Sequence, residues 1–122
     1  MSSWLRVAVL AATTVLVLAV LAPVSTGKTT KVHAASTTHG FVWQPKIKKV
    51  AKGVKVVWTN PTSAAHTVTA YSRNWKKNTT IKPGGRTSMV FRRSGTFLYR
   101  CFFHSTLSKG KCGGQCGRIV VK

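Results

Sequence analysis

Acidic side chains are absent from this sequence. Its 122 residues contain no Asp or Glu but 20 Lys and Arg, which gives a formal net charge of +20. Without carboxylates the chain can form no paired acid/base site, no Ser-His-Asp triad and no carboxylate cage for calcium or magnesium. Most hydrolase mechanisms are therefore excluded, and we expect a protein that is not an enzyme. No side-chain salt bridge can form, so stability must come from burial and hydrogen bonds.

The missing carboxylates also predict resistance to acid. Acid unfolding mostly reflects carboxylates whose pKa is depressed in the folded state, and this chain has no such side chains. We expect tolerance of acid to be limited by protonation of the four histidines.

The basic composition bears on partners. Lys and Arg are dispersed along the chain rather than gathered in a nucleic-acid motif, so we expect no specific nucleic-acid partner. Nonspecific attraction to an anionic wall or lipid surface follows from the net charge alone.

Residues 1–34 have the pattern of an export signal with its cleavage region. Arg6 precedes an uncharged run of Val, Leu and Ala over residues 7–21, which is short for a membrane span of roughly 20 apolar residues. We expect cleavage near Ala34, with an earlier cut near Gly27 or an uncleaved anchor as alternatives. The predicted location is periplasmic, extracellular or attached to the cell envelope.

The rest of the chain has the pattern of an all-β domain. Residues 35–40 are rich in Ser and Thr and are predicted as a tether, and residues 41–122 as the folded domain. Short alternating segments separated by Gly and Pro turns indicate an antiparallel β-sandwich. The expected strands are 41–43, 47–50, 54–59, 66–70, a short strand beginning at Ile81, 87–91, 95–104 and 118–121, with loops at 71–80 and 105–117.

Three cysteines in an exported chain leave one unpaired. Cys112 and Cys116 are close together in a Gly-rich segment, and a disulfide between them is the simplest interpretation. Cys101 then remains free on an alternating strand, with His104 three residues later. His66 follows a turn at the start of another strand. One thiolate and two imidazoles are the trigonal ligand set of a blue-copper site.

From Phe41 onward the sequence resembles the cupredoxin family, the plastocyanin- and amicyanin-like blue copper proteins. The matching runs are 56–60 leading into 66–69, then 83–85 and 95–104. The resemblance implies a Greek-key sandwich with one type 1 copper per chain, held by His66, Cys101 and His104. It also implies an exported, monomeric one-electron carrier. Its redox partner would present an acidic or neutral docking face.

The axial position departs from the family pattern. Amicyanin-like members carry a Met three residues after the second histidine, and here that residue is Leu107, which cannot donate to copper. Three alternatives remain: a three-coordinate site, a weak approach by the Ala65 carbonyl, and a reach of Gln115 into the site, as the glutamine of plant phytocyanins does. The first two together are favoured. Loss of the soft axial donor then predicts a raised reduction potential.

Other interpretations and supporting residues remain. Thr67 and Asn60 are candidates for hydrogen bonds that brace the ligands. The Cys112-x3-Cys116 segment also resembles the dinuclear copper loop of cytochrome oxidase, but the His and Met that continue that loop are missing. The spacing of a zinc ribbon is missing too. The alternative function is an extracytoplasmic copper-binding or delivery protein, or a wall-associated module without a redox partner.

Overall fold

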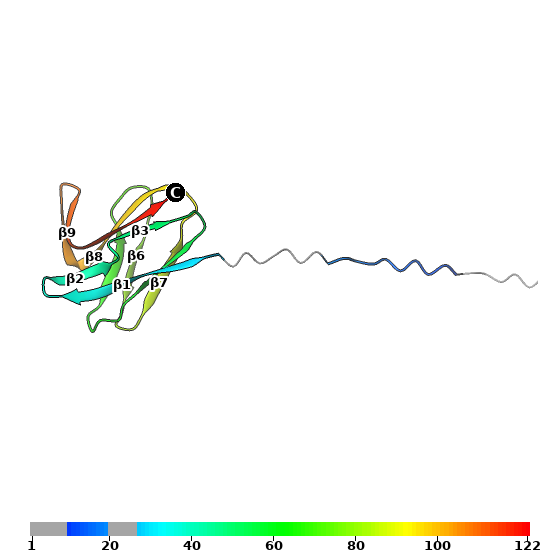
Figure 1. Cartoon of the computed structure of the whole chain (residues 1–122), viewed down its shortest axis with the longest axis horizontal. Helices are drawn as coiled ribbons and strands as arrows, with labels where there is room; N and C mark the ends of the chain where they lie inside the picture. Colours follow the sequence, from blue (N-terminus) through cyan, green and yellow to red (C-terminus); the bar gives the residue numbers. More distant parts are fainter. Residues whose placement is uncertain (1–9, 20–26) are drawn as a thin grey trace, which may run out of the picture.

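The chain folds into two packed β-sheets with no helix among the residues that the structure, a computed structural model, describes, which are 10–19 and 27–122 (Figure 1). The strands are β1 (Thr29–Thr37), β2 (Gly40–Gln44), β3 (Ile47–Val50), β4 (Lys55–Thr59), β5 (His66–Ala70), β6 (Asn78–Ile81), β7 (Arg86–Val90), β8 (Gly95–Ser108) and β9 (Lys111–Val121). One sheet has the order β2-β1-β4-β7 and the other β3-β9-β8-β5-β6.

The sandwich predicted from the alternating pattern is confirmed, with one refinement in strand direction. Most neighbouring strands are antiparallel, but β1 pairs parallel to β4 and β3 pairs parallel to β9. Parallel neighbours need a crossover, and here the connection from each strand to its partner passes through the opposite sheet. Both sheets are therefore mixed rather than purely antiparallel.

Aromatic side chains dominate the space between the sheets. Trp43, Trp58 and Tyr99 are fully buried, and Trp75 and Phe91 pack beside them. Burying a side chain of this size stabilises the fold by roughly 1.5–3 kcal/mol relative to exposing it. The core holds the two sheets against each other and so fixes the end of the sandwich where β5 begins.

The first strand lies where the sequence predicted a cleavage region and a tether. Residues 29–37 form β1, which pairs with β2 on one side and β4 on the other, and Val32 and Ala34 are fully buried. The prediction of a tether over residues 35–40 is therefore wrong, because these residues form the end of β1, the turn after it and the start of β2. Val32 and Ala34 alternate with exposed neighbours, but the surrounding small residues and Thr and Ser make this alternation weak in the sequence.

The predicted export signal lies partly outside the described residues, which omit 1–9 and 20–26. Residues 10–19 have no regular secondary structure and are exposed. Across the described parts of the chain, no helix is long and apolar enough to cross a membrane.

Two predicted loops contain strands. β6 occupies the end of the expected loop 71–80, and Ile81 ends this strand rather than beginning it. The expected loop 105–117 is a hairpin in which β8 continues to Ser108 and β9 starts at Lys111. This hairpin lies at the same end of the sandwich as the turn between β1 and β2, away from the C-terminus (Figure 1).

Candidate metal centre

Two strands of one sheet bring a thiol and two imidazoles together. His66 is the first residue of β5, directly after the turn that leaves β4. Cys101 and His104 lie on β8, in an interruption of its pairing with β9. Arg100 pairs with Cys116 and Ser105 with Gly114, so four residues of β8 face one residue of β9. The surplus residues form the loop that carries both β8 ligands.

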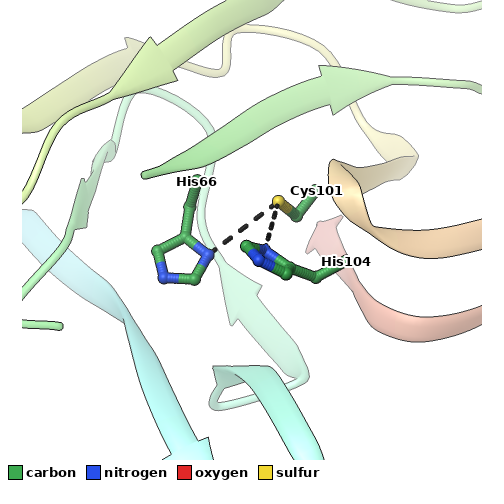
Figure 2. A group of neighbouring side chains, drawn as sticks. All are labelled: His66, Cys101 and His104. Carbon is green, nitrogen blue, oxygen red and sulfur yellow. Dashed lines mark hydrogen bonds between the residues drawn. The ribbon is translucent and has the colours of Figure 1, made fainter. Parts of the chain in front are cut away.

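The three side chains point to a common centre (Figure 2). The Cys101 Sγ lies 3.3 Å from His104 Nδ1 and 3.9 Å from His66 Nδ1, and all three donor atoms lie within 4.8 Å of one another. A metal roughly 2.0–2.3 Å from each of three surrounding donors would separate those donors by about 3.5–4 Å. The group therefore fits one ion with one sulfur and two nitrogen ligands.

His66 is held at both ring nitrogens. Its Nε2 lies 2.7 Å from Thr62 Oγ1, and Thr62 Oγ1 lies 2.7 Å from Asn60 Oδ1. Asn60 is itself buried and donates to the carbonyls of Ala64 and Ile81. Without a metal, His66 Nδ1 lies 2.8 Å from Gln115 Oε1. With a metal bound at Nδ1, Thr62 would donate to Asn60 and accept the His66 Nε2 proton.

Burial sets the protonation of His66. Desolvation lowers the pKa of His66 below 6.5; its hydrogen bond with Gln115 opposes this shift, and the nearby His104 adds to it. A neutral imidazole is the form that binds a metal, so His66 is kept ready for coordination.

Backbone and side-chain hydrogen bonds surround the Cys101 sulfur. The Thr67 backbone N–H donates to Cys101 Sγ at 3.3 Å, and the Thr67 hydroxyl accepts from the Phe102 N–H at 2.7 Å. Thr67 therefore ties β5 to the ligand loop on both sides of the thiol. The N–H contact fixes the position of the sulfur relative to β5.

His104 is the open side of the site. It is half-buried, whereas His66 and Cys101 have no exposed surface. The Phe41 ring packs against both imidazoles, 4.8 Å from the His66 ring and 4.6 Å from the His104 ring. Phe102 and Phe103 next to it are exposed by 61% and 56%. The outer face of the site is thus an imidazole within an apolar surround.

Gln115 is a neighbour of the donor group. It is fully buried in β9, its Oε1 lies 2.8 Å from His66 Nδ1, and its amide nitrogen lies 3.5 Å from the Val42 carbonyl. It faces the four surplus residues of β8 alone, without a partner in the pairing of β8 with β9. Its side-chain oxygen therefore contacts a residue of the donor group.

The other axial candidates lie differently. Leu107 pairs with Cys112 in the outer part of the hairpin and is 40% exposed. Ala65 is half-buried immediately before His66. Met89 lies on β7, in the opposite sheet, and packs against the core. The expectation of a three-coordinate site with a weak approach by the Ala65 carbonyl stays a prediction.

Thr62 and Phe41 contact the donor group, and neither contact is predicted from the sequence. A signal for Thr62 exists, because Asn60-Pro61-Thr62 places a hydroxyl in the turn that delivers His66. Phe41 offers none, since its contacts depend on how β2 crosses the end of the other sheet. The disulfide predicted between Cys112 and Cys116 is confirmed, and the described cysteine left free is Cys101.

Comparison with solved structures gives the fold. The chain is similar to a purple cupredoxin from Nitrosopumilus maritimus, with 22% identity, a TM-score of 0.58, and coverage of 75% of this chain and 98% of that one. It is also similar to a reduced Cu(I) form of an amicyanin variant, with 20% identity, a TM-score of 0.61, and coverage of 80% and 83%. An oxidised amicyanin variant matches at 21% identity and a TM-score of 0.62, covering 82% and 87%.

Sequence comparison is silent where structure comparison is clear. No protein-family model matches the chain, and no curated protein matches its sequence. The chain has the cupredoxin fold, with a His66-Cys101-His104 donor group at one end of the sandwich.

Proposed function

We propose that this chain is an exported one-electron carrier that binds a single copper ion through His66, Cys101 and His104. The observation that carries the proposal is the convergence of their three donor atoms within 4.8 Å at the end of a cupredoxin fold. One thiolate with two imidazoles is a set that suits copper. Copper, when bound, supplies the Cu(I)/Cu(II) couple that takes up and releases one electron.

We further propose that Gln115 would supply a fourth donor, in place of the three-coordinate site with a weak approach by the Ala65 carbonyl that the sequence favours. Support comes from its Oε1, which lies 2.8 Å from the His66 donor atom. This choice changes the expected potential. An amide oxygen is a harder donor than a thioether and favours Cu(II), so the potential should lie below that of Met-ligated relatives.

The residues around the site would keep its geometry constant between the two oxidation states. Thr62 and Asn60 hold the His66 ring, and Thr67 holds the Cys101 sulfur. Electrons would pass through the half-exposed edge of His104, whose apolar surround, including Phe102 and Phe103, excludes water at a docked partner. The partner would be a redox protein with an acidic or neutral face, because a cationic surface speeds encounters with such a face.

The visible spectrum with Cu(II) tests the function. Coordination by Cys101 predicts an intense blue or violet thiolate band that disappears in Cys101→Ala and persists in Met89→Leu, a matched control on the opposite sheet. A reversible one-electron potential would support a carrier, whereas rapid loss of copper to an acceptor would support delivery. A colourless Cu(II) complex of the folded protein would refute the proposed site.

A further inference from the structure

The disulfide is built around the residue that reaches the metal site. Cys112 and Cys116 are joined, and the segment that they close contains Gly113, Gly114 and Gln115. Gln115 has no partner in the pairing of β8 with β9, because the ladder skips from Arg100–Cys116 to Ser105–Gly114. Gln115 is thus flanked by two paired residues, Gly114 and Cys116, but is not itself paired with a residue of β8.

The glycines of the segment press its backbone against the ligand loop. Gly114 has a φ of +91°, and a Cβ built on it would lie 2.5 Å from the His104 carbonyl oxygen. Two adjacent glycines are the most flexible backbone available, so a close approach built from them is entropically costly to hold. The covalent link between Cys112 and Cys116 removes that freedom over a very short loop.

The disulfide is open to attack on one side. Cys112 is half-buried, while Cys116 is only 6% exposed. Both line a cavity of about 190 Å³ that Lys46 and Arg118 also line. A small dithiol can therefore reach the bridge from this cavity, and the more exposed Cys112 is the sulfur that it would attack.

We propose that the Cys112–Cys116 disulfide is a positioning bridge that holds Gln115 against the metal site, so that its reduction by a dithiol raises the copper potential. The inference rests on the proposed copper site. In the reaction one dithiol thiolate attacks Cys112 Sγ and its second thiol resolves the mixed disulfide. Two electrons and two protons pass to the protein, which gains two thiols, and the reductant becomes a cyclic disulfide.

The first test uses the double variant Cys112→Ser/Cys116→Ser in the copper-loaded protein, measured by voltammetry. With the bridge gone, Gln115 leaves the site and Cu(II) loses a donor. We expect the Cu(I)/Cu(II) ratio at fixed potential to rise about tenfold, which is about 59 mV for one electron. Wild type treated with dithiothreitol in its Cu(I) form should shift equally, and Ser108→Ala, exposed in the same hairpin, should not shift.

A double-mutant cycle identifies Gln115 as the carrier of the effect. Gln115→Leu should raise the potential, and opening the bridge in that background should add nothing. The inference is overturned if the serine variant keeps the wild-type potential while Gln115→Leu shifts it. It is equally overturned if the bridge has the same effect with leucine at 115.

A metal-free readout separates this inference from the copper proposal. In the metal-free protein Gln115 Oε1 lies 2.8 Å from His66 Nδ1, so the Nδ1–H tautomer would donate to it, and this buried proton should give a slowly exchanging NMR signal. The signal should disappear in the serine variant and persist in Ser108→Ala. Persistence in the folded serine variant would refute the bridge. A failure to bind copper in a blue site would refute the proposed function while this signal still tests the bridge.

Discussion

At the scale of single residues, the two histidines of the site have different surroundings. His66 contacts Thr62 at one ring nitrogen and Gln115 at the other, and its ring has no exposed surface. For His104 the one polar contact among the described residues is Cys101, and its ring is half-exposed. His66 is therefore the more tightly held imidazole, and under the proposed function His104 would be the ligand through which a partner reaches the metal.

Thr62 provides the first prediction. Thr62→Val keeps the shape of the side chain but removes the oxygen that meets His66 Nε2, so the ring loses its orienting contact. Loss of such a partner typically costs 10–100-fold in metal affinity. Competition of a chelator for Cu(I) would measure this loss, and Ser63→Ala, an exposed hydroxyl in the same turn, is the control. An unchanged affinity in a folded Thr62→Val protein would contradict the role.

The donor residues themselves were predictable from sequence because their signals are local. Cys101 and His104 share one loop, and His66 follows a turn with a strand behind it. The sequence does not favour Gln115, because nothing in it shows that the pairing of β8 and β9 breaks opposite this residue. Contacts that depend on a register shift or on the crossing of β2 appear only once the strands are placed.

At the scale of elements, β1 sets a limit on where a processed form of the protein could begin. The strand lies between β2 and β4, so its loss would expose an edge on each and open the core at Val32 and Ala34. The sequence does not predict β1, because its alternation of apolar and polar residues is weak among small residues such as Ala, Ser and Thr. A cut after Ala34 would remove most of β1, whereas a cut near Gly27 would leave it whole.

Truncation of the chain tests this limit. A protein that starts at residue 35 should be less stable than one that starts at residue 28 by at least about 2 kcal/mol, because burial of Val32 alone is worth roughly that much. For a domain of this size the melting temperature should fall by roughly 10 °C or more. Thermal unfolding by circular dichroism measures the difference. Mass spectrometry of the exported protein should find an N-terminus before residue 29; one at residue 35 on a stable fold would contradict the prediction.

At the scale of the whole molecule, the charged side chains all have the same sign. Twenty basic side chains and no acidic ones mean that folding brings only like charges together. Among the described residues, basic side chains make hydrogen bonds and cation–π contacts instead, such as Lys77 over Trp58 and Arg100 over Phe102. Each such contact contributes roughly 0.5–1 kcal/mol at exposed sites. Stability therefore depends on the aromatic core, and its pH dependence rests on few groups.

The acid limb of stability should therefore come from histidine, with His66 as its main source. Burial lowers the pKa of His66 in the folded, metal-free protein, so the unfolded chain takes up its proton first as pH falls through about 6.5. Stability is complete above that pH, decreases below it by about 1.4 kcal/mol for each unit by which the pKa is lowered, and levels off once folded His66 is also protonated. Cys101 and His104 are the titratable groups beside it.

Urea unfolding of the metal-free protein between pH 8 and pH 2 would measure this profile. His66→Gln should flatten the decrease below pH 6.5, whereas His33→Gln, exposed on β1, should leave it unchanged. In a chain with carboxylate side chains a second decrease would follow near pH 4, as groups with depressed pKa values are protonated. Here no side chain can cause one, so a steep loss of stability below pH 4 that persists in His66→Gln would show that acid acts through some other property of the fold.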